Sequence, residues 1–147
     1  MKATEGKMGR VFVVRLEDGD ILPECLEELA REKSIRQGQV ILVGGISRGE
    51  VVAGPRHSDE MPPDPVYMPV RGAHEVVGAG VIAPDKEGKP VLHIHASLGR
   101  GENVLTGCLR PGVTTWLVAE AIIIEVTGVS AQRLPDDRSG FNLLEVD

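Results

Sequence analysis

Two histidines and one cysteine between Val91 and Leu109 are the residues of this chain whose types and spacing best suit metal chemistry. The stretch begins with strict alternation of side chains, which is typical of an extended strand with two different faces. His93 and His95 fall on the same face, and two residues of strand rise by about 6.7 Å, so their ring nitrogens can converge on one ion. Cys108 follows as a third soft ligand. Two imidazoles and one thiolate suit a tetrahedral zinc-type ion with one open position.

The same three residues also have a plainer interpretation. A His-x-His pair can lie on a solvated polar face of a strand, and Cys108 can be a small core residue. One such pair with a distant cysteine is a less specific signal than two Cys-x-x-Cys motifs. Spacing alone therefore leaves both the metal site and the structural role open.

The elements that must position these residues are mostly strands, because apolar and β-branched runs alternate with turn residues along the chain. One segment has its apolar residues at helical spacing, which predicts a helix over 22–34. The predicted strands cover 9–16, 39–46, 50–53, 74–83, 91–98, 116–129 and 141–146. Residues 84–90 look like a hairpin connection, so the strands at 74–83 and 91–98 should pair antiparallel. The count predicts an α+β domain with a mostly antiparallel sheet of about seven strands and one main packed helix.

The segments between these elements are predicted as turns and loops. Residues 54–69 hold five of the ten prolines, which favours a long loop or an irregular edge. Arg48-Gly49 is expected to form a tight turn, and 99–107 a glycine-rich loop. Two carboxylates, Glu120 and Glu125, lie within the apolar run near the C-terminus, where a buried charge needs a partner. We expect a structural ion pair with Arg10, Arg15 or Arg71 rather than catalysis.

Composition limits the class of protein. The chain has 147 residues, which predicts one domain over 1–147 with an N-terminal arm at 1–9. Twenty-two acidic residues against sixteen basic ones give a net charge of −6, which does not favour non-specific nucleic-acid binding. No apolar run is long enough to span a membrane, no signal peptide is recognisable, and two cysteines do not make a disulfide framework. A cytoplasmic protein that does not bind membranes is expected.

From about Arg10 onward the chain resembles the PPC domain, the plant-and-prokaryote conserved domain. The stretches that carry the resemblance include VGGIS at 43–47, HEVVGAG at 74–80, PVLHIHASLG at 90–99 and SGFNLL at 139–144. The resemblance implies a homotrimer of α+β domains, free-standing as in bacterial and archaeal members. Plant members carry an AT-hook and regulate transcription through DNA, but nothing in this sequence resembles that basic motif.

The resemblance also bears on the metal ligands. Many relatives read Gly-Gly-His-Leu where this chain reads Thr106-Gly107-Cys108-Leu109. Three histidines at these positions look like a metal site, and a cysteine in the third place keeps a zinc ligand while favouring a softer ion.

Two main functions remain open for the sequence. The first is a trimeric binding or regulatory module for a small molecule or a protein, with or without a bound metal. The second is a zinc-dependent hydrolase or lyase that uses His93, His95 and Cys108 as ligands and Glu75 as general base. DNA binding is expected only through the family resemblance.

Overall fold

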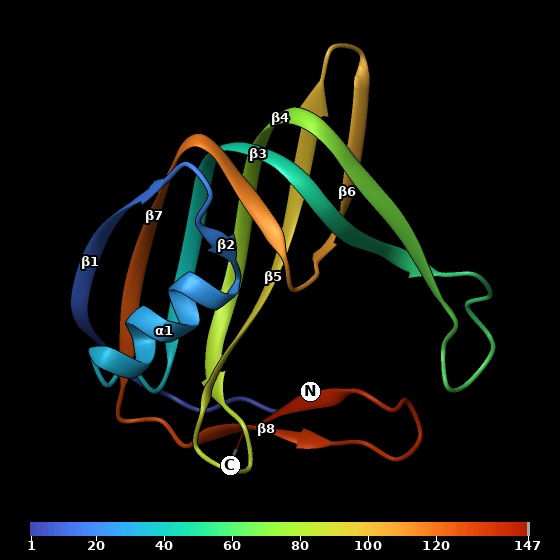
Figure 1. The fold of residues 1–147 in the computed structure, drawn as a ribbon. Helices are drawn as coiled ribbons and strands as arrows, with labels where there is room; N and C mark the ends of the chain where they lie inside the picture. Colours follow the sequence, from blue (N-terminus) through green and yellow to red (C-terminus); the bar gives the residue numbers. More distant parts are fainter. Residues whose placement is uncertain (147) are drawn as a thin grey trace.

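A strongly curved antiparallel sheet dominates the computed structural model, which describes residues 1–146, and a single helix packs against the sheet (Figure 1). The elements in chain order are β1 (Lys7–Glu17), β2 (Ile21–Leu22), α1 (Glu24–Glu32), β3 (Gly38–Pro55), β4 (Pro65–Pro84), β5 (Pro90–Arg100), β6 (Asn103–Leu109), β7 (Val113–Thr127), β8 (Ala131–Pro135) and β9 (Asn142–Val146). None of the helical segments in residues 1–146 has the length and apolar character of a membrane span.

The main sheet has seven strands in the order β1-β7-β3-β4-β5-β6, with the short β2 paired to β7. Strand β3 also pairs with β6, and β8 and β9 form a separate two-stranded hairpin. The predicted antiparallel α+β architecture is confirmed, as is the hairpin between the strands at 74–83 and 91–98, which belong to β4 and β5. Each strand alternates between a face that covers the core and a face turned outward.

The core lies between the inner face of the sheet and α1. The helix buries Leu26 and Ala30, and its acidic first turn suits the positive end of the helix dipole. The largest fully buried side chains are aliphatic, as the scarcity of aromatic residues requires; they include Leu16, Leu42, Ile46, Ile82, Ile94, Leu98 and Ile123.

Several predicted loops are in fact strand. Residues 38–55 form one continuous strand, which passes through Arg48-Gly49 where a tight turn was expected, and Gly49 has a φ of +132°. The predicted loop at 54–69 shrinks to 56–64, because Pro55 and Pro65 face each other at the mouth of a β3–β4 hairpin. Most of the predicted glycine-rich loop at 99–107 is strand. β5 ends at Arg100 and β6 begins at Asn103, so the connection is a tight turn that contains Gly101 (φ +60°). The last predicted strand pairs with β8, which sequence patterns did not indicate.

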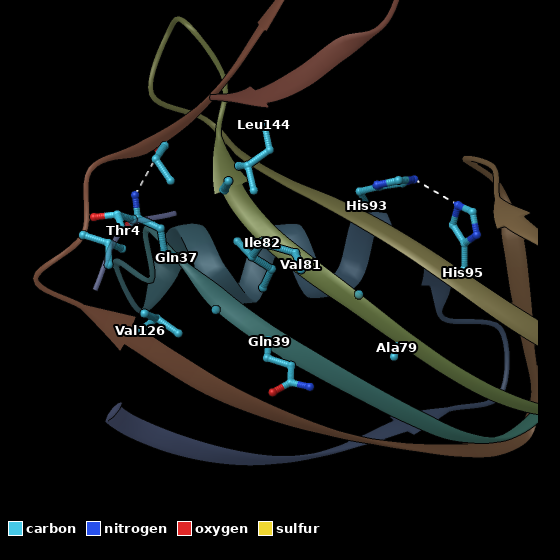
Figure 2. Close-up of a pocket in the computed structure, with 15 residues that line it drawn as sticks. Thr4, Gln37, Gln39, Ala79, Val81, Ile82, His93, His95, Val126 and Leu144 are labelled. Atoms are coloured by element: carbon cyan, nitrogen blue, oxygen red, sulfur yellow. Dashed lines mark hydrogen bonds between the residues drawn. The ribbon is translucent and has the colours of Figure 1, made fainter. Parts of the chain in front are cut away.

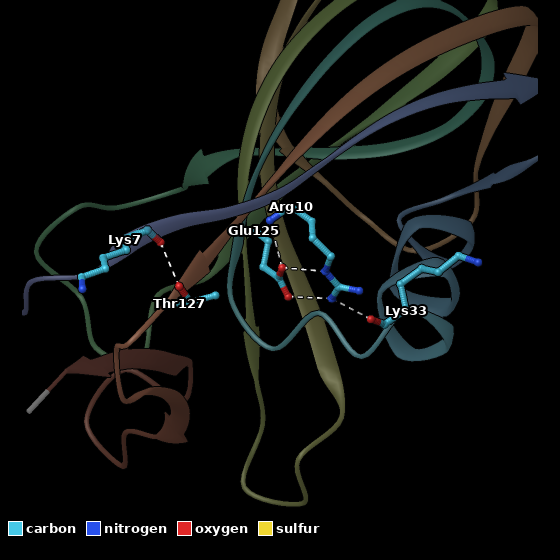
Figure 3. A network of polar contacts seen from close by, with 5 residues as sticks. All are labelled: Lys7, Arg10, Lys33, Glu125 and Thr127. Atoms are coloured by element: carbon cyan, nitrogen blue, oxygen red, sulfur yellow. Dashed lines mark hydrogen bonds and ion pairs between the residues drawn. The ribbon is translucent and has the colours of Figure 1, made fainter.

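One of the two carboxylates of the apolar run has the expected arginine partner. Glu125 accepts two side-chain hydrogen bonds from Arg10, at 2.8 Å from Nε and 2.7 Å from Nη2 (Figure 3). The backbone N–H of Arg10 donates a third at 3.1 Å. These bonds stabilise the charged form and lower the pKa of Glu125 to about 2. The expectation that Glu120 is buried is wrong, because its side chain lies on the outward face opposite Arg15.

Candidate metal centre

His93 and His95 lie on the outward face of β5, while the intervening Ile94 is buried in the core. The Nε2 atoms of the two imidazoles are 3.1 Å apart, and the rings stand edge to face with an interplanar angle of 83°. Two nitrogens bound to one tetrahedral zinc ion are separated by about 3.3 Å, given zinc–nitrogen bonds of about 2.05 Å. The pair therefore already has nearly the separation that a shared ion requires.

The β5–β6 hairpin brings Cys108 to the same place. In the register of this hairpin Cys108 lies directly opposite His95, so both side chains share the outward face. Ligand atoms of His93, His95 and Cys108 all lie within 4.8 Å of one another. A nitrogen and a sulfur on one zinc ion are about 3.6 Å apart, so small side-chain rotations suffice to complete the set. The three donors fit a soft divalent ion with one open position.

Glycines on the neighbouring strands allow close approach to the strands that carry the ligands. A Cβ added to Gly80 on β4 would lie 2.7 Å from the carbonyl oxygen of His93. A Cβ on Gly107, next to Cys108, would lie 2.3 Å from the carbonyl oxygen of Val52. Each glycine therefore permits a backbone approach that a side chain would block, which fixes the strands that carry the ligands.

Charged groups around the cluster are mainly cationic. Partial burial lowers the pKa of His93, and the positive charges of Arg133, His95 and Arg110 lower it further. Arg133 is itself buried, and its Nη2 donates a hydrogen bond of 3.0 Å to the carbonyl oxygen of Val81. Val81 is the cross-strand partner of His93, so the guanidinium lies beside the cluster. Sequence analysis did not single out Arg133, because a lone arginine in an unrecognised strand carries no pattern.

The structure does not bring Glu75 to the ligands. Glu75 pairs with Gly99, whereas His95 pairs with Ala79, four residues further along β4. Four residues of strand span about 13 Å, which is too far for direct proton transfer. Ser97 instead shares a hydrogen bond of 2.8 Å with Thr106, two residues along each strand of the hairpin from the His95–Cys108 pair.

A hollow of about 670 Å³ adjoins the two histidines and runs along the outward face toward the C-terminal hairpin (Figure 2). It is an open depression of the surface and not an enclosed cavity. Most of its lining is aliphatic, with Ala79, Val81, Ile82, Val126 and Leu144 among the contributing residues. The polar side chains on its wall, apart from the histidines, come from Thr4, Gln37 and Gln39.

Comparison with known proteins gives a matching family for the sequence and similar solved structures for the fold. Residues 3–127 match the family described as the Plants and Prokaryotes Conserved (PCC) domain. The fold is similar to that of a metal-containing protein from Archaeoglobus fulgidus, with a TM-score of 0.85, 24% identity and 99% coverage of both chains. It is also similar to a candidate DNA-binding protein from Ralstonia eutropha, with a TM-score of 0.73, 23% identity, and 92% and 90% of the two chains covered.

One curated relative is much longer than this chain. The bifunctional protein GlmU of Synechococcus is 24% identical over 140 residues, which cover 94% of this chain but only 21% of GlmU. The chain thus spans about a fifth of the length of that relative.

Proposed function

The chain belongs to the Plants and Prokaryotes Conserved (PCC) domain family, and we propose that within this family it acts as a metal-holding homotrimeric binding module. His93, His95 and Cys108 would hold a zinc-type divalent ion, which would supply Lewis acidity at one open position. The observation that carries the proposal is the 3.1 Å separation of the two Nε2 atoms with Cys108 opposite one of them. The metal-containing relative from Archaeoglobus fulgidus, which has the same fold, supports it.

Self-association is supported by the outward face of the sheet. Val13 is 82% exposed and Val77 58% exposed, and Ile41 and Val43 are exposed on the same face. Val43 and Val77 are cross-strand neighbours, so the apolar side chains form a continuous surface rather than scattered points. A continuous exposed apolar surface is typical of a protein interface. The proposed occupant is a further copy of this chain, as the family resemblance implies.

A zinc-dependent hydrolase or lyase is the second candidate, because three ligands with an open position are the arrangement of catalytic zinc. Its weakness is the proton-transfer group, since Glu75 lies four residues of strand from the register position of His95. DNA binding is supported by the fold it shares with the Ralstonia eutropha protein. The net charge of −6 argues against it.

The experiment that tests the metal proposal is elemental analysis of the purified, untagged protein beside a His93→Ala/His95→Ala variant. Near-stoichiometric zinc or a similar ion is expected in the unaltered protein and should be absent from the variant. Both imidazoles lie on the outward face, so the variant should fold. Circular dichroism checks that it does. Equal metal content in the two proteins would overturn the proposal.

A further inference from the structure

Arg133 of β8 is a buried cation. The residue is 6% exposed, and its buried Nε has no hydrogen-bond partner among residues 1–146. Among residues 1–146 no carboxylate lies within ion-pair distance of this guanidinium. The acidic side chain whose charge acts on Arg133 is Glu27, but Glu27 accepts a hydrogen bond of 2.8 Å from the backbone N–H of Leu92. Burying a charge in this way is costly unless something compensates it.

The position of the guanidinium shows where a negatively charged group can bind and compensate its charge. Its hydrogen bond to Val81 fixes it behind the strand position opposite His93. From there its positive charge contributes to lowering the pKa of His93. A positive charge held in a poorly solvated place acts over several ångströms with little screening. An anion next to the histidines would therefore be favoured over a neutral molecule of the same shape.

The hollow beside the histidines indicates what the remainder of such an anion looks like. Its aliphatic wall, formed by residues such as Ala79, Val81 and Leu144, suits an apolar body rather than a second charged group. His93 and His95 lie at one end of the hollow, and the polar side chains of Thr4 and Gln37 lie toward the other end (Figure 2). A single negative group at the metal end and a short hydrocarbon body along the aliphatic wall between the two ends match this lining.

We infer that the open position of the His93–His95–Cys108 centre takes a small organic monocarboxylate, and that Arg133 is the positioning residue that selects its negative charge. This inference rests on the proposed metal centre. It adds the chemical class of the ligand and gives the C-terminal hairpin a part in the site.

The test uses Co²⁺ as a spectroscopic substitute for zinc in the full-length protein. Butyrate, the neutral butyramide and inorganic phosphate are titrated while the visible Co²⁺ absorption is recorded. Butyrate is expected to bind at least about tenfold more tightly than butyramide, because the Co²⁺ ion and the guanidinium both attract the charged ligand. Phosphate should bind more weakly than butyrate, because it has no apolar body.

Arg133→Gln should reduce the preference for butyrate over butyramide severalfold without changing the Co²⁺ stoichiometry, and the remaining preference comes from the Co²⁺ ion itself. Arg138→Gln removes the same charge from an exposed place on the same hairpin and should leave the preference intact. Equal effects of the two variants, or phosphate binding as tightly as butyrate, would overturn the inference while the metal centre stands. Failure of the unaltered protein to bind Co²⁺ would overturn the proposed function itself. If Arg133→Gln does not fold, equal affinity of the unaltered protein for butyrate and butyramide still refutes the inference.

Discussion

His95 and Cys108 lie directly opposite each other across the β5–β6 hairpin. This relationship depends on the tight turn between the strands, because a slip of one residue in register would turn Cys108 toward the core. The third ligand is therefore placed by the hairpin geometry and not by its proximity in sequence. It also means that each ligand comes from a rigid strand, which suits a preformed metal site.

Replacing Cys108 tests whether its sulfur is a ligand. Loss of groups that merely support a ligand costs about 10- to 100-fold in metal affinity, so Cys108→Ser should lower zinc affinity by about a hundredfold or more. Cys108→His should retain binding, because imidazole is also a zinc ligand. Competition with a chromophoric chelator at neutral pH under reducing conditions measures both.

Cys25→Ser is the matched control for this experiment. Burial is the main reason that the pKa of the Cys25 thiol rises to about 11, so this thiol stays protonated at neutral pH and does not offer a thiolate. Zinc affinity should be unchanged in this variant. If the two serine variants lower zinc affinity equally, the assignment of Cys108 is refuted.

Gly80→Ala tests the close approach of β4 to the backbone of His93. The new Cβ would lie 2.7 Å from the His93 carbonyl oxygen and 2.8 Å from Cβ of Ile94, so the strands must move apart. We expect a loss of about 1 to 3 kcal/mol in unfolding free energy, typical of overpacking, together with weaker metal binding. Denaturant titration and the chelator assay measure the two effects.

The control for Gly80 is Gly99→Ala on β5, where an added Cβ meets no atom within 4 Å. It changes a glycine to alanine in the same pair of strands without a clash. Similar losses in both variants would show that glycine content, and not the packing against His93, sets the effect.

Much of the strand pattern could be predicted from the sequence, because alternation of polar and apolar residues reports directly on a sheet with one buried face. His93, Ile94 and His95 show this most clearly. The register in which the strands pair was harder to predict from the sequence. The β6 strand begins at Asn103 after a turn at Gly101, and its glycines and polar residues gave no periodic signal.

The cationic part of the site could not be predicted, since it depends on where the C-terminal hairpin packs. Arg133 acts beside Val81, far away in sequence, and only the tertiary fold brings the two together. The prediction that Glu120 is buried was wrong for a related reason. It lies in a run of apolar residues, yet the run alternates between the core and an exposed apolar face, so hydrophobicity did not report burial.

Removal of Arg10 should destabilise the protein, with a defined pH dependence. Glu125 has a side chain only 12% exposed and would lose both side-chain hydrogen bonds from Arg10. Arg10→Ala should lower the Tm at neutral pH by about 5 °C. The pKa of Glu125 falls from its usual 4.5 to about 2 on folding, so this stabilisation is complete above pH 4.5 and is lost as the pH falls to about 2.

Thermal unfolding between pH 2 and 7 checks this prediction, with Arg15→Ala as the control. Arg15 and Glu17 form an exposed pair at 3.6 Å on the same strand, where ion pairs contribute little. The difference in Tm between Arg10→Ala and the unaltered protein should shrink toward pH 2. A constant difference over the whole range would contradict an electrostatic origin.

Val77→Glu should dissociate the proposed homotrimer. Val77 lies on the exposed apolar face beside Val43, and a carboxylate there would have to be desolvated on assembly. Val104→Glu places the same charge on an equally accessible valine near the tip of the β5–β6 hairpin and should leave assembly unchanged. Analytical ultracentrifugation should give a trimer for the unaltered protein and the Val104 variant, and smaller species for the Val77 variant. A monomeric unaltered protein would refute the proposed self-association, because the apolar face would then be stable in contact with water.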